Sequence, residues 1–547
     1  TNPNGCVLFY ALENEYDWFW LFKKLEGEAV PDVPGMFRSL RDIVWSHGIT
    51  IPLTDASGIP PGNPFFAGTG DIEGILITPN QYPGTAAISG EGPYNMEGVT
   101  AKAMAELHSS TMHNGLYVNT PSLVSETDRL VTLLQRIIFG GMEGANLFNF
   151  VGYTAEGYQN GIDALFSGNV VDAINNPAIA YFGSQIDFRC PVSPRGVLRP
   201  YYFIMKRKIE FLNTFSEAIA SCGEAKKDGV VSVNNTDIGT WEDGKRSNYW
   251  LETDDGTVFL SLLNQGHYDG NVLTTPTDQG IGIKGIKVKD ISFPNFTTMT
   301  IPFEDIDTTN PDEKWNDMIV PVNLPIGDGF PRLSYSTSEI LTLRNFNGRK
   351  LLVIYGREGT PGETRMTGLN GNAEVVFNSL FFPNIVENDG STLTFHYVHA
   401  PDTFLVLNLP GGKILQIIVT TIERANKYWF FDWGGRQFMV SDIDYLESAF
   451  SDQGNLKISA QRRLGPSNVL ILSPFEPAAL IDDTIPGSVG FSYTAEAMAL
   501  AYSSTVSFTL PTLASVNSGR LFSEPIPAPS QAESSWTGEP KPLEEIG

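Results

Sequence analysis

The sequence predicts an α/β region followed by an all-β region. Up to about residue 222, short apolar runs alternate with amphipathic helical segments, which is the pattern of βα units around a parallel sheet. From about Gly229 onward, short segments of alternating hydrophobicity are separated by Gly, Pro, Asn and Asp, which indicates β-sandwich domains. A chain of 547 residues is long enough for two to four domains with sizeable cores.

The elements of the α/β region follow one another at regular spacing. The first apolar run, residues 6–11, has the continuous hydrophobicity of a parallel strand that is buried on both faces. Residues 36–46 are predicted to be helical, with Phe37, Leu40 and Val44 on one face and Gly48 ending the helix. The other predicted strands are 49–53, 74–78, 116–118 and 145–151, and the other predicted helices are 18–25, 100–112, 127–139 and 200–220.

The all-β region contains several clear strands. Strands are predicted at 257–263, 350–355, 393–398, 404–409 and 414–421. We expect a β-sandwich domain at 229–430, a further β domain at 431–520, and an extended tail rich in Pro, Ser and Glu at 521–547. Together with an α/β domain at 1–222, this divides the chain into four parts.

Charge and cysteine content narrow the classes of function. The net charge of −26 argues against nucleic-acid binding, because a phosphate backbone would be repelled. No run approaches the roughly eighteen apolar residues that a membrane helix needs, so we expect a soluble protein without a membrane span. Cys6, Cys190 and Cys222 allow at most one internal disulfide, and whether Cys190 and Cys222 pair stays open.

Polar residues follow two of the predicted strands directly. Asn14, Glu15 and Tyr16 come after the first strand, and Asp55 comes after the second. In (β/α) barrels the chemistry lies at the C-terminal ends of the strands. Taken by spacing alone, Glu13 and Glu15 also fit a pair of surface carboxylates at the end of a strand.

The segment Asn14-Glu15-Tyr16 after an apolar strand resembles the acid/base strand of glycoside hydrolase family 35, the β-galactosidases. Further segments resemble that family in the same order: Thr54-Asp55-Ala56-Ser57, residues 146–154, Tyr158-Gln159-Asn160-Gly161, Ile186-Asp187-Phe188 and Arg199-Pro200-Tyr201-Tyr202. Residues 338–356 resemble a strand pair, and residues 423–429 resemble a later strand, of the second domain of the larger, fungal-type members. The resemblance implies that residues 1–222 are strands four to eight of an eight-stranded TIM barrel.

Five βα units do not close such a barrel. An open parallel sheet would leave edge strands uncovered, so we expect a further polypeptide or segment to supply barrel strands one to three.

The resemblance implies a retaining glycosidase site that lacks one carboxylate. Such a site needs two carboxylates about 5 to 5.5 Å apart, an acid/base and a nucleophile. Glu15 corresponds to the acid/base, whereas Thr120 stands where the family has its nucleophile, with Asn119 and Pro121 on either side. Residues expected to contact a sugar are Asn14, Tyr16, Asp55, Tyr158 and Asp187. Glu126 lies six residues beyond Thr120, near an expected helix start, and Glu91 and Glu143 are further carboxylates that do not follow the right strand.

These residues lead to three hypotheses of function. The first is a catalytically inactive β-galactosidase-like protein that acts as an extracellular structural or carbohydrate-binding subunit of a larger assembly. The alternative is an active retaining β-galactosidase that releases terminal β-galactose with Glu15 as acid/base. A third is a galactose-binding lectin that keeps the pocket without turnover. A carboxylate within about 5.5 Å of Glu15 would contradict the first hypothesis.

The remaining motifs are few. Asn234 and Asn295 begin Asn-x-Thr triplets, which would accept glycans in a secreted protein. His396 and His399 are expected on opposite faces of a strand, so we predict packing or surface histidines and no metal site. The Gly-rich segment 356–362 lacks the Lys and helix of a phosphate loop and is predicted to be a turn, and no cofactor motif is present.

Overall fold

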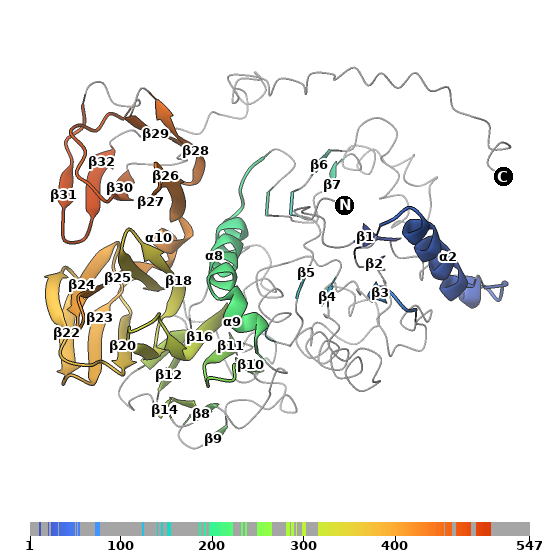
Figure 1. Ribbon diagram of the computed structural model, residues 1–547, viewed down its shortest axis with the longest axis horizontal. Coiled ribbons are helices and arrows are strands. Elements are labelled where there is room, and N and C mark those ends of the chain that lie inside the picture. The colour runs from blue at the N-terminus through green and yellow to red at the C-terminus, as the bar shows by residue number, and fades with distance from the viewer. Residues whose placement is uncertain are drawn as a thin grey trace.

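The computed structural model of the chain is mostly β-sheet with few helices, consistent with β-sandwich domains. Figure 1 shows the larger sheets gathered on one side, with α8 between them and the N-terminal elements. The residues that the structure describes are 10–12, 20, 23–30, 32–49, 51, 53–54, 72–76, 123–124, 139, 144–145, 150–151, 153–154, 185–186, 191–192, 196–222, 231–233, 236–237, 249–264, 281–284, 286–288, 291–292, 298–301, 316–452, 455–461, 467–482 and 488–504.

A small parallel sheet lies near the start of the chain. Strands β1 (Tyr10–Ala11), β2 (Leu53–Thr54) and β3 (Ile75–Leu76) pair in parallel and in chain order. Helix α2 (Val33–Ser46) connects β1 to β2, and its Phe37 packs with Leu53 and Ile75. The helix begins three residues earlier than predicted, because Asp32 accepts a hydrogen bond from the backbone N–H of Gly35 (2.9 Å) and so caps it.

The other short strands of this region form separate pairs. β4 (Leu123–Val124) and β5 (Gly144–Ala145) are parallel, whereas β6 (Tyr153–Thr154) and β7 (Gln185–Ile186) are antiparallel. The predicted strand 116–118 and the predicted helix 100–112 lie outside the described residues. The predicted helix 200–220 is present as two helices, α8 (Pro200–Thr214) and α9 (Ser216–Ala220), because the backbone leaves the helical conformation at Phe215.

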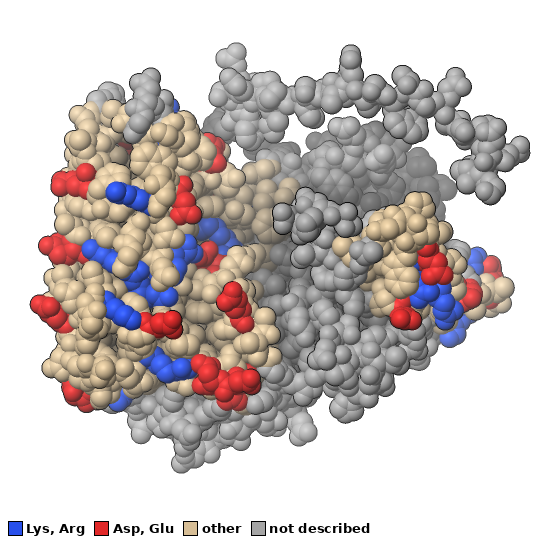
Figure 2. Space-filling model, viewed as in Figure 1, with Lys and Arg blue, Asp and Glu red and all other residues tan. Residues whose placement is uncertain are grey.

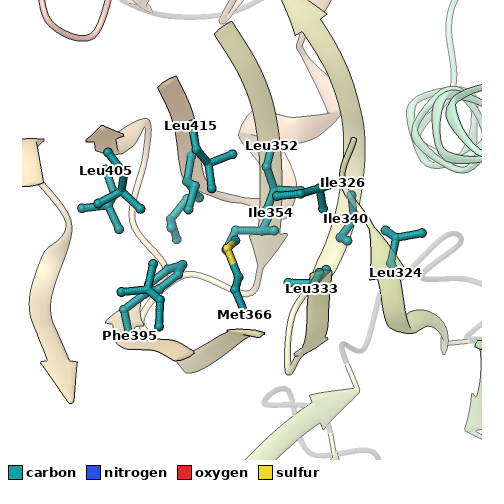
Figure 3. Packing of buried hydrophobic residues seen from close by; sticks show 14 of the residues in the cluster. Leu324, Ile326, Leu333, Ile340, Leu352, Ile354, Met366, Phe395, Leu405 and Leu415 are labelled. Carbon is teal, nitrogen blue, oxygen red and sulfur yellow. The ribbon is translucent and has the colours of Figure 1, made fainter. Parts of the chain in front are cut away.

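Two large sheets form a sandwich. The outer sheet has the order β10 (Tyr249–Glu252), β11 (Val258–Asn264), β16 (Asn316–Pro325), β17 (Arg332–Ser336), β20 (Pro361–Thr367), β23 (Thr392–Val398) and β22 (Phe381–Asn388). The central sheet has the order β18 (Glu339–Phe346), β19 (Arg349–Gly356), β25 (Lys413–Thr421), β24 (Thr403–Leu409) and β21 (Glu374–Asn378). Their facing side chains, including Leu333, Met366 and Phe395 from one sheet and Leu352 and Leu415 from the other, interdigitate to form one core (Figure 3).

The central sheet is buried on both faces. On β19, Leu352 and Ile354 contact the outer sheet, whereas Leu351, Val353 and Tyr355 contact a third sheet. Side chains of a strand alternate between faces, so a strand that is covered on both sides must be apolar throughout. This explains the uninterrupted run of residues 351–355 and the parallel pairing of β19 with β25.

The third sheet, here called the C-terminal sheet, covers the far side of the central sheet. Its order is β26 (Trp429–Trp433), β27 (Arg436–Ser441), β30 (Ser467–Leu472), β32 (Ala499–Ser504) and β31 (Ser492–Thr494). The short helix α10 (Ile422–Asn426) connects the central sheet to it. The strand expected at 423–429 is wrong, because the side chain of Thr421 caps a helix there and β26 begins only at Trp429. A separate hairpin is formed by β28 (Tyr445–Asp452) and β29 (Asn455–Gln461).

The remaining short strands form two small sheets, and in the chain they lie either just before β10 or between β11 and β16. β8 (Val231–Val233), β9 (Thr236–Asp237), β13 (Ile286–Val288) and β14 (Ile291–Ser292) form one sheet, and β12 (Ile281–Lys284) pairs with β15 (Thr298–Ile301). Among the described residues, no helix is both long enough and apolar enough to span a membrane.

Candidate functional site

The parallel strands β1 and β2 end at the same edge of their sheet. The backbone N–H of Leu12 donates to the carbonyl of Thr54 (2.9 Å), which extends the pairing by one residue beyond β1. In the chain Asp55 follows Thr54 directly. The predicted site residues Asn14, Glu15, Tyr16, Asp55, Thr120, Tyr158 and Asp187 lie outside the described residues, as do Glu91, Glu126, Glu143, Asn234 and Asn295. Their roles therefore stay predictions.

A buried polar cluster, here called the Ser338 cluster, lies inside the sandwich. The hydroxyl of Ser338 is 2.8 Å from Nε2 of His399 and 2.8 Å from the hydroxyl of Tyr397. Nδ1 of His399 is 2.8 Å from the carbonyl oxygen of Thr360, and Thr364 lies 3.0 Å from the Tyr397 hydroxyl. All these groups come from β18, β20 and β23 or from residues directly beside them.

The geometry assigns the tautomer of His399. A carbonyl can only accept, so Nδ1 carries the proton and donates to Thr360, and Nε2 accepts from the Ser338 hydroxyl. Burial lowers the pKa of His399 to about 4, which keeps the ring neutral at physiological pH.

A serine hydroxyl bonded to a neutral imidazole is the arrangement of an activated nucleophile. Here the imidazole is oriented by a carbonyl instead of a carboxylate, and Ser338 and His399 are only 2% and 3% exposed. A substrate cannot reach groups that are buried to this extent. The Ser338 cluster therefore satisfies polar groups in the core and has no catalytic role.

The second histidine has a different partner. His396 bonds through Nε2 to Glu363, which also accepts from the hydroxyl of Tyr335 (2.5 Å). Burial and the adjacent carboxylate raise the pKa of Tyr335. His396 and His399 therefore serve separate side-chain networks. The described residues contain no group of three or more His, Cys, Asp or Glu that could hold a metal ion. Of the segment 356–362, predicted to be a turn, residues 357–360 connect β19 to β20, whereas Gly356, Pro361 and Gly362 belong to the strands.

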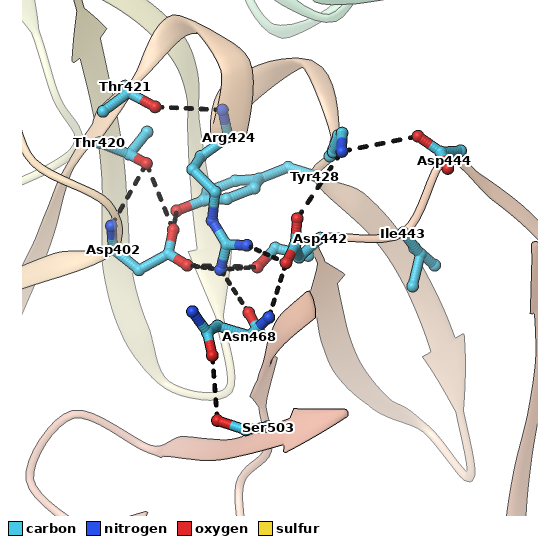
Figure 4. A network of polar contacts seen from close by, with 12 residues as sticks. Asp402, Thr420, Thr421, Arg424, Tyr428, Asp442, Ile443, Asp444, Asn468 and Ser503 are labelled. Atoms are coloured by element: carbon cyan, nitrogen blue, oxygen red, sulfur yellow. Dashed lines mark hydrogen bonds and ion pairs between the residues drawn. The ribbon is translucent and has the colours of Figure 1, made fainter. Parts of the chain in front are cut away.

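A charged cluster, here called the Arg424 cluster, joins the central sheet to the C-terminal sheet (Figure 4). The guanidinium of Arg424 on α10 contacts Asp402 and Asp442 (2.9 Å to the latter) and donates to the carbonyl of Asn468 (2.8 Å). Asp402 also accepts from the hydroxyl of Tyr428. Burial alone would lower the pKa of Arg424, but the carboxylates of Asp402 and Asp442 raise it overall.

Both carboxylates come from residues with left-handed backbone. Asp402 has φ 50° and Asp442 has φ 61°, a conformation that L-residues other than Gly, Asn and Asp rarely adopt. Each turn aims its carboxylate at the same guanidinium, and Arg424 offers the planar fork that two carboxylates can share. The cluster is a structural joint between two sheets.

Charges on the visible surface of the sheets are mixed. Figure 2 shows Lys and Arg side chains interspersed with Asp and Glu over the described part of the molecule. A surface of this kind gives no single-sign field for attracting a polyanion or polycation.

Cys222 has a free thiol. Its Sγ donates to the carbonyl of Ala218 (3.3 Å), and burial raises the pKa of the thiol to about 11, which disfavours the reactive thiolate. Cys6 and Cys190 lie outside the described residues.

Comparison with known proteins identifies one segment. The family model "Beta-galactosidase, domain 2" matches residues 318–428, which run from β16 through α10. This segment contains most of both sandwich sheets and all of the Ser338 cluster. It relates the chain to the β-galactosidases and agrees with the resemblance of residues 338–356 and 423–429.

The other comparisons add little. Among solved structures, a crystal structure of gamma-CGTase from alkalophilic Bacillus clarkii is similar at 8% identity over 79% of this chain and 66% of that chain. Its TM-score of 0.21 is too low to carry an argument about the fold. In the comparison with curated proteins, none matches significantly. The sandwich segment 318–428 is thus a β-galactosidase-like domain.

Proposed function

We propose that this chain is a member of glycoside hydrolase family 35 that has lost its nucleophile. In this proposal it acts as a structural or carbohydrate-binding subunit of an extracellular assembly. The observation that carries the proposal is the match of residues 318–428 to the second domain of β-galactosidases. It is supported by Asn14-Glu15-Tyr16 just beyond β1 and by Thr120 in place of the nucleophile.

The proposal assigns residues 1–222 to the last five units of a TIM barrel, ahead of β domains at 229–430 and 431–520 and a tail at 521–547. The parallel pairing of β1, β2 and β3 in chain order, with α2 crossing between β1 and β2, supports this assignment. Since five units do not close an eight-stranded barrel, we propose that the other three units are supplied by a further segment or polypeptide.

The loss of the nucleophile would remove the chemistry but not the pocket. A retaining enzyme needs a carboxylate to form the glycosyl-enzyme intermediate, and a threonine hydroxyl at position 120 is not activated for that step. Glu15 would still hydrogen-bond a glycosidic oxygen, and Asp55 and Asp187 would still accept from sugar hydroxyls. Binding without turnover is therefore compatible with this set of residues.

The alternative is an active β-galactosidase that releases terminal β-galactose, with Glu15 as acid/base. The feature in its favour is the intact Asn14-Glu15-Tyr16 motif. The nucleophile would then be a carboxylate at another position, such as Glu126.

Hydrolysis of a chromogenic β-galactoside by the native, fully assembled protein tests the proposal. If the proposal is right, the protein does not hydrolyse the substrate. A carbohydrate-binding subunit would also bind galactose saturably, whereas a purely structural subunit would not bind it. Steady turnover that is lost in Glu15→Gln and kept in Glu13→Gln would support the active enzyme instead. Glu13→Gln is the matched control because it removes a carboxylate two residues away.

A gain-of-function variant separates lost chemistry from a pocket that never forms. Thr120→Glu restores the missing carboxylate, and we expect it to bring slow turnover that again depends on Glu15. A separate experiment tests the extracellular location. If the protein is secreted, Asn234 and Asn295 should carry glycans, and enzymatic deglycosylation should lower the mass of the native protein. Unmodified asparagines at both positions would remove the support that these triplets lend to secretion.

A further inference from the structure

Helix α8 makes close polar contacts with the β-sheets over a wide part of its circumference. Lys206, Arg207 and Lys208 are consecutive, so they point in directions about 100° apart around the helix axis. Lys206 and Arg207 bond to the end of α10, and Lys208 bonds to the central sheet. Lys206 donates to the carbonyl of Asn426 (3.3 Å), Arg207 bonds to the Asn426 side chain (3.1 Å), and Lys208 bonds to Glu339 on β18 (2.5 Å).

The pair Lys208–Glu339 is buried, with side chains 5% and 4% exposed. The same carboxylate oxygen of Glu339 also accepts from the backbone N–H of Ile319 on β16 (3.0 Å). Buried charges are tolerated only when they are paired and hydrogen-bonded. One carboxylate thus connects α8, the central sheet and the outer sheet.

Aromatic contacts continue along the same helix. Lys206 lies 4.1 Å from the centre of the Trp429 ring, and Arg207 lies 4.7 Å from that of Tyr355. One turn beyond Arg207, Phe211 belongs to the core of the sandwich, as does Phe215 after the end of the helix. Both rings contact Phe259 on β11, with centroids 6.2 and 5.8 Å away.

The C-terminal half of α8 is fastened as well. Glu210 pairs with Arg344, whose guanidinium lies 3.8 Å from the centre of the Phe430 ring. The hydroxyl of Thr214 is 2.9 Å from that of Thr342 on β18. Near the start of α8, Tyr202 packs against Phe150, which lies earlier in the sequence (ring centroids 6.0 Å apart).

We infer that α8 is the docking helix of the sandwich and forms one cooperative unit with it. A helix of this length is marginal by itself in water, so its stability must come from the surface on which it packs. That surface consists of β18, β19, α10 and β11. The boundary between cooperative units then does not fall after residue 222, because α8 belongs with the sandwich. Phe139 of the α/β region also lies in that core, so the sandwich unit includes part of the chain before Pro200.

Hydrogen exchange of the full chain, read by mass spectrometry, tests this without a substitution. Amides of 203–214 should exchange at the same rate as those of β18 and β19, and more slowly than those of α2. If α8 amides exchange at the faster rate of α2, independently of β18 and β19, the inference is wrong.

A variant then tests the connection directly. Lys208→Met leaves Glu339 charged and buried without its cation, so exchange should accelerate about 150- to 5000-fold in α8, β18 and β19 together. Lys457→Met, which removes an exposed lysine on β29, is the matched control and should change nothing. Acceleration confined to α8 would show that the helix opens separately and would overturn the inference. Should Lys208→Met not fold, Lys208→Arg keeps the charge in a poorer geometry and should give a smaller acceleration in the same three elements.

Discussion

Replacing Gly356 by alanine should destabilise the sandwich by displacing His399. A Cβ at position 356 would lie 2.5 Å from both Cε1 and Nε2 of the imidazole. Non-bonded heavy atoms pack at roughly 3.5–4.0 Å, so the ring must move by about 1 Å. His399 is held on both sides, by Ser338 and Thr360, each at 2.8 Å.

The cost follows from these distances. A shift of about 1 Å breaks at least one of the two hydrogen bonds, and a buried polar group without its partner costs about 1–3 kcal/mol. Overpacking of a close-packed core adds about 1–3 kcal/mol. Because the ring relieves the clash by giving up a hydrogen bond, the two terms partly overlap, and we expect a loss of about 2–4 kcal/mol in total.

The assay is the free energy of opening of β19, β23 and β25, obtained from hydrogen exchange of the full chain. Gly490→Ala is the control, because no atom lies within 4 Å of the place that its added Cβ would take. A double variant with His399→Ser should be less destabilised than the sum of the two single variants, since the smaller side chain removes the clash. If Gly356→Ala is as stable as Gly490→Ala, the packing argument is refuted.

Two further predictions concern the same sheets. Arg424→Met leaves the partly buried carboxylate of Asp402 without a cation and leaves Asp442 with Lys427 alone, 3.7 Å away, so the C-terminal sheet should lose about 2–3 kcal/mol of stability in hydrogen exchange; Arg424→Lys should lose less, and equal losses would contradict the role of the guanidinium fork. Because burial lowers the pKa of His399 from 6.5 to about 4, the unfolded chain binds its proton first, and stability should fall as the pH drops from 6.5 to 4. Between pH 7 and pH 4.5, the free energy of unfolding measured in urea should fall by about 2–3 kcal/mol more in the wild type than in His399→Gln.

Much of the sandwich could be predicted because its signals are local. Alternating segments bounded by turn residues place the strands near 257–263, 350–355, 393–398, 404–409 and 414–421, and the structure has a strand at each. The relation of residues 338–356 and 423–429 to a β-galactosidase second domain is confirmed by the family match. Helix α2 was also predictable, because its apolar face has a helical period and Gly48 ends it.

The break between α8 and α9 was not predictable from periodicity. Residues 200–220 carry a continuous helical pattern, yet the chain leaves the helix at Phe215. The ring of Phe215 is buried in the core beside Phe259, so packing decides the backbone at this point. The Ser338 cluster was missed for a related reason: Ser338 and His399 are far apart in the sequence and meet only when β18 and β23 come together.

The sequence alone determined the class of each region, since period-2 and period-3.6 patterns, turn residues and apolar runs act over a few neighbouring residues. It also located the segment 338–356 that resembles a β-galactosidase second domain, which the family match confirms. Only the tertiary structure decided which strands pair, that the central sheet is covered on both faces, and that Lys208 meets Glu339. Those choices depend on contacts between distant segments, where burial makes each unpaired charge costly and so selects one arrangement of the chain.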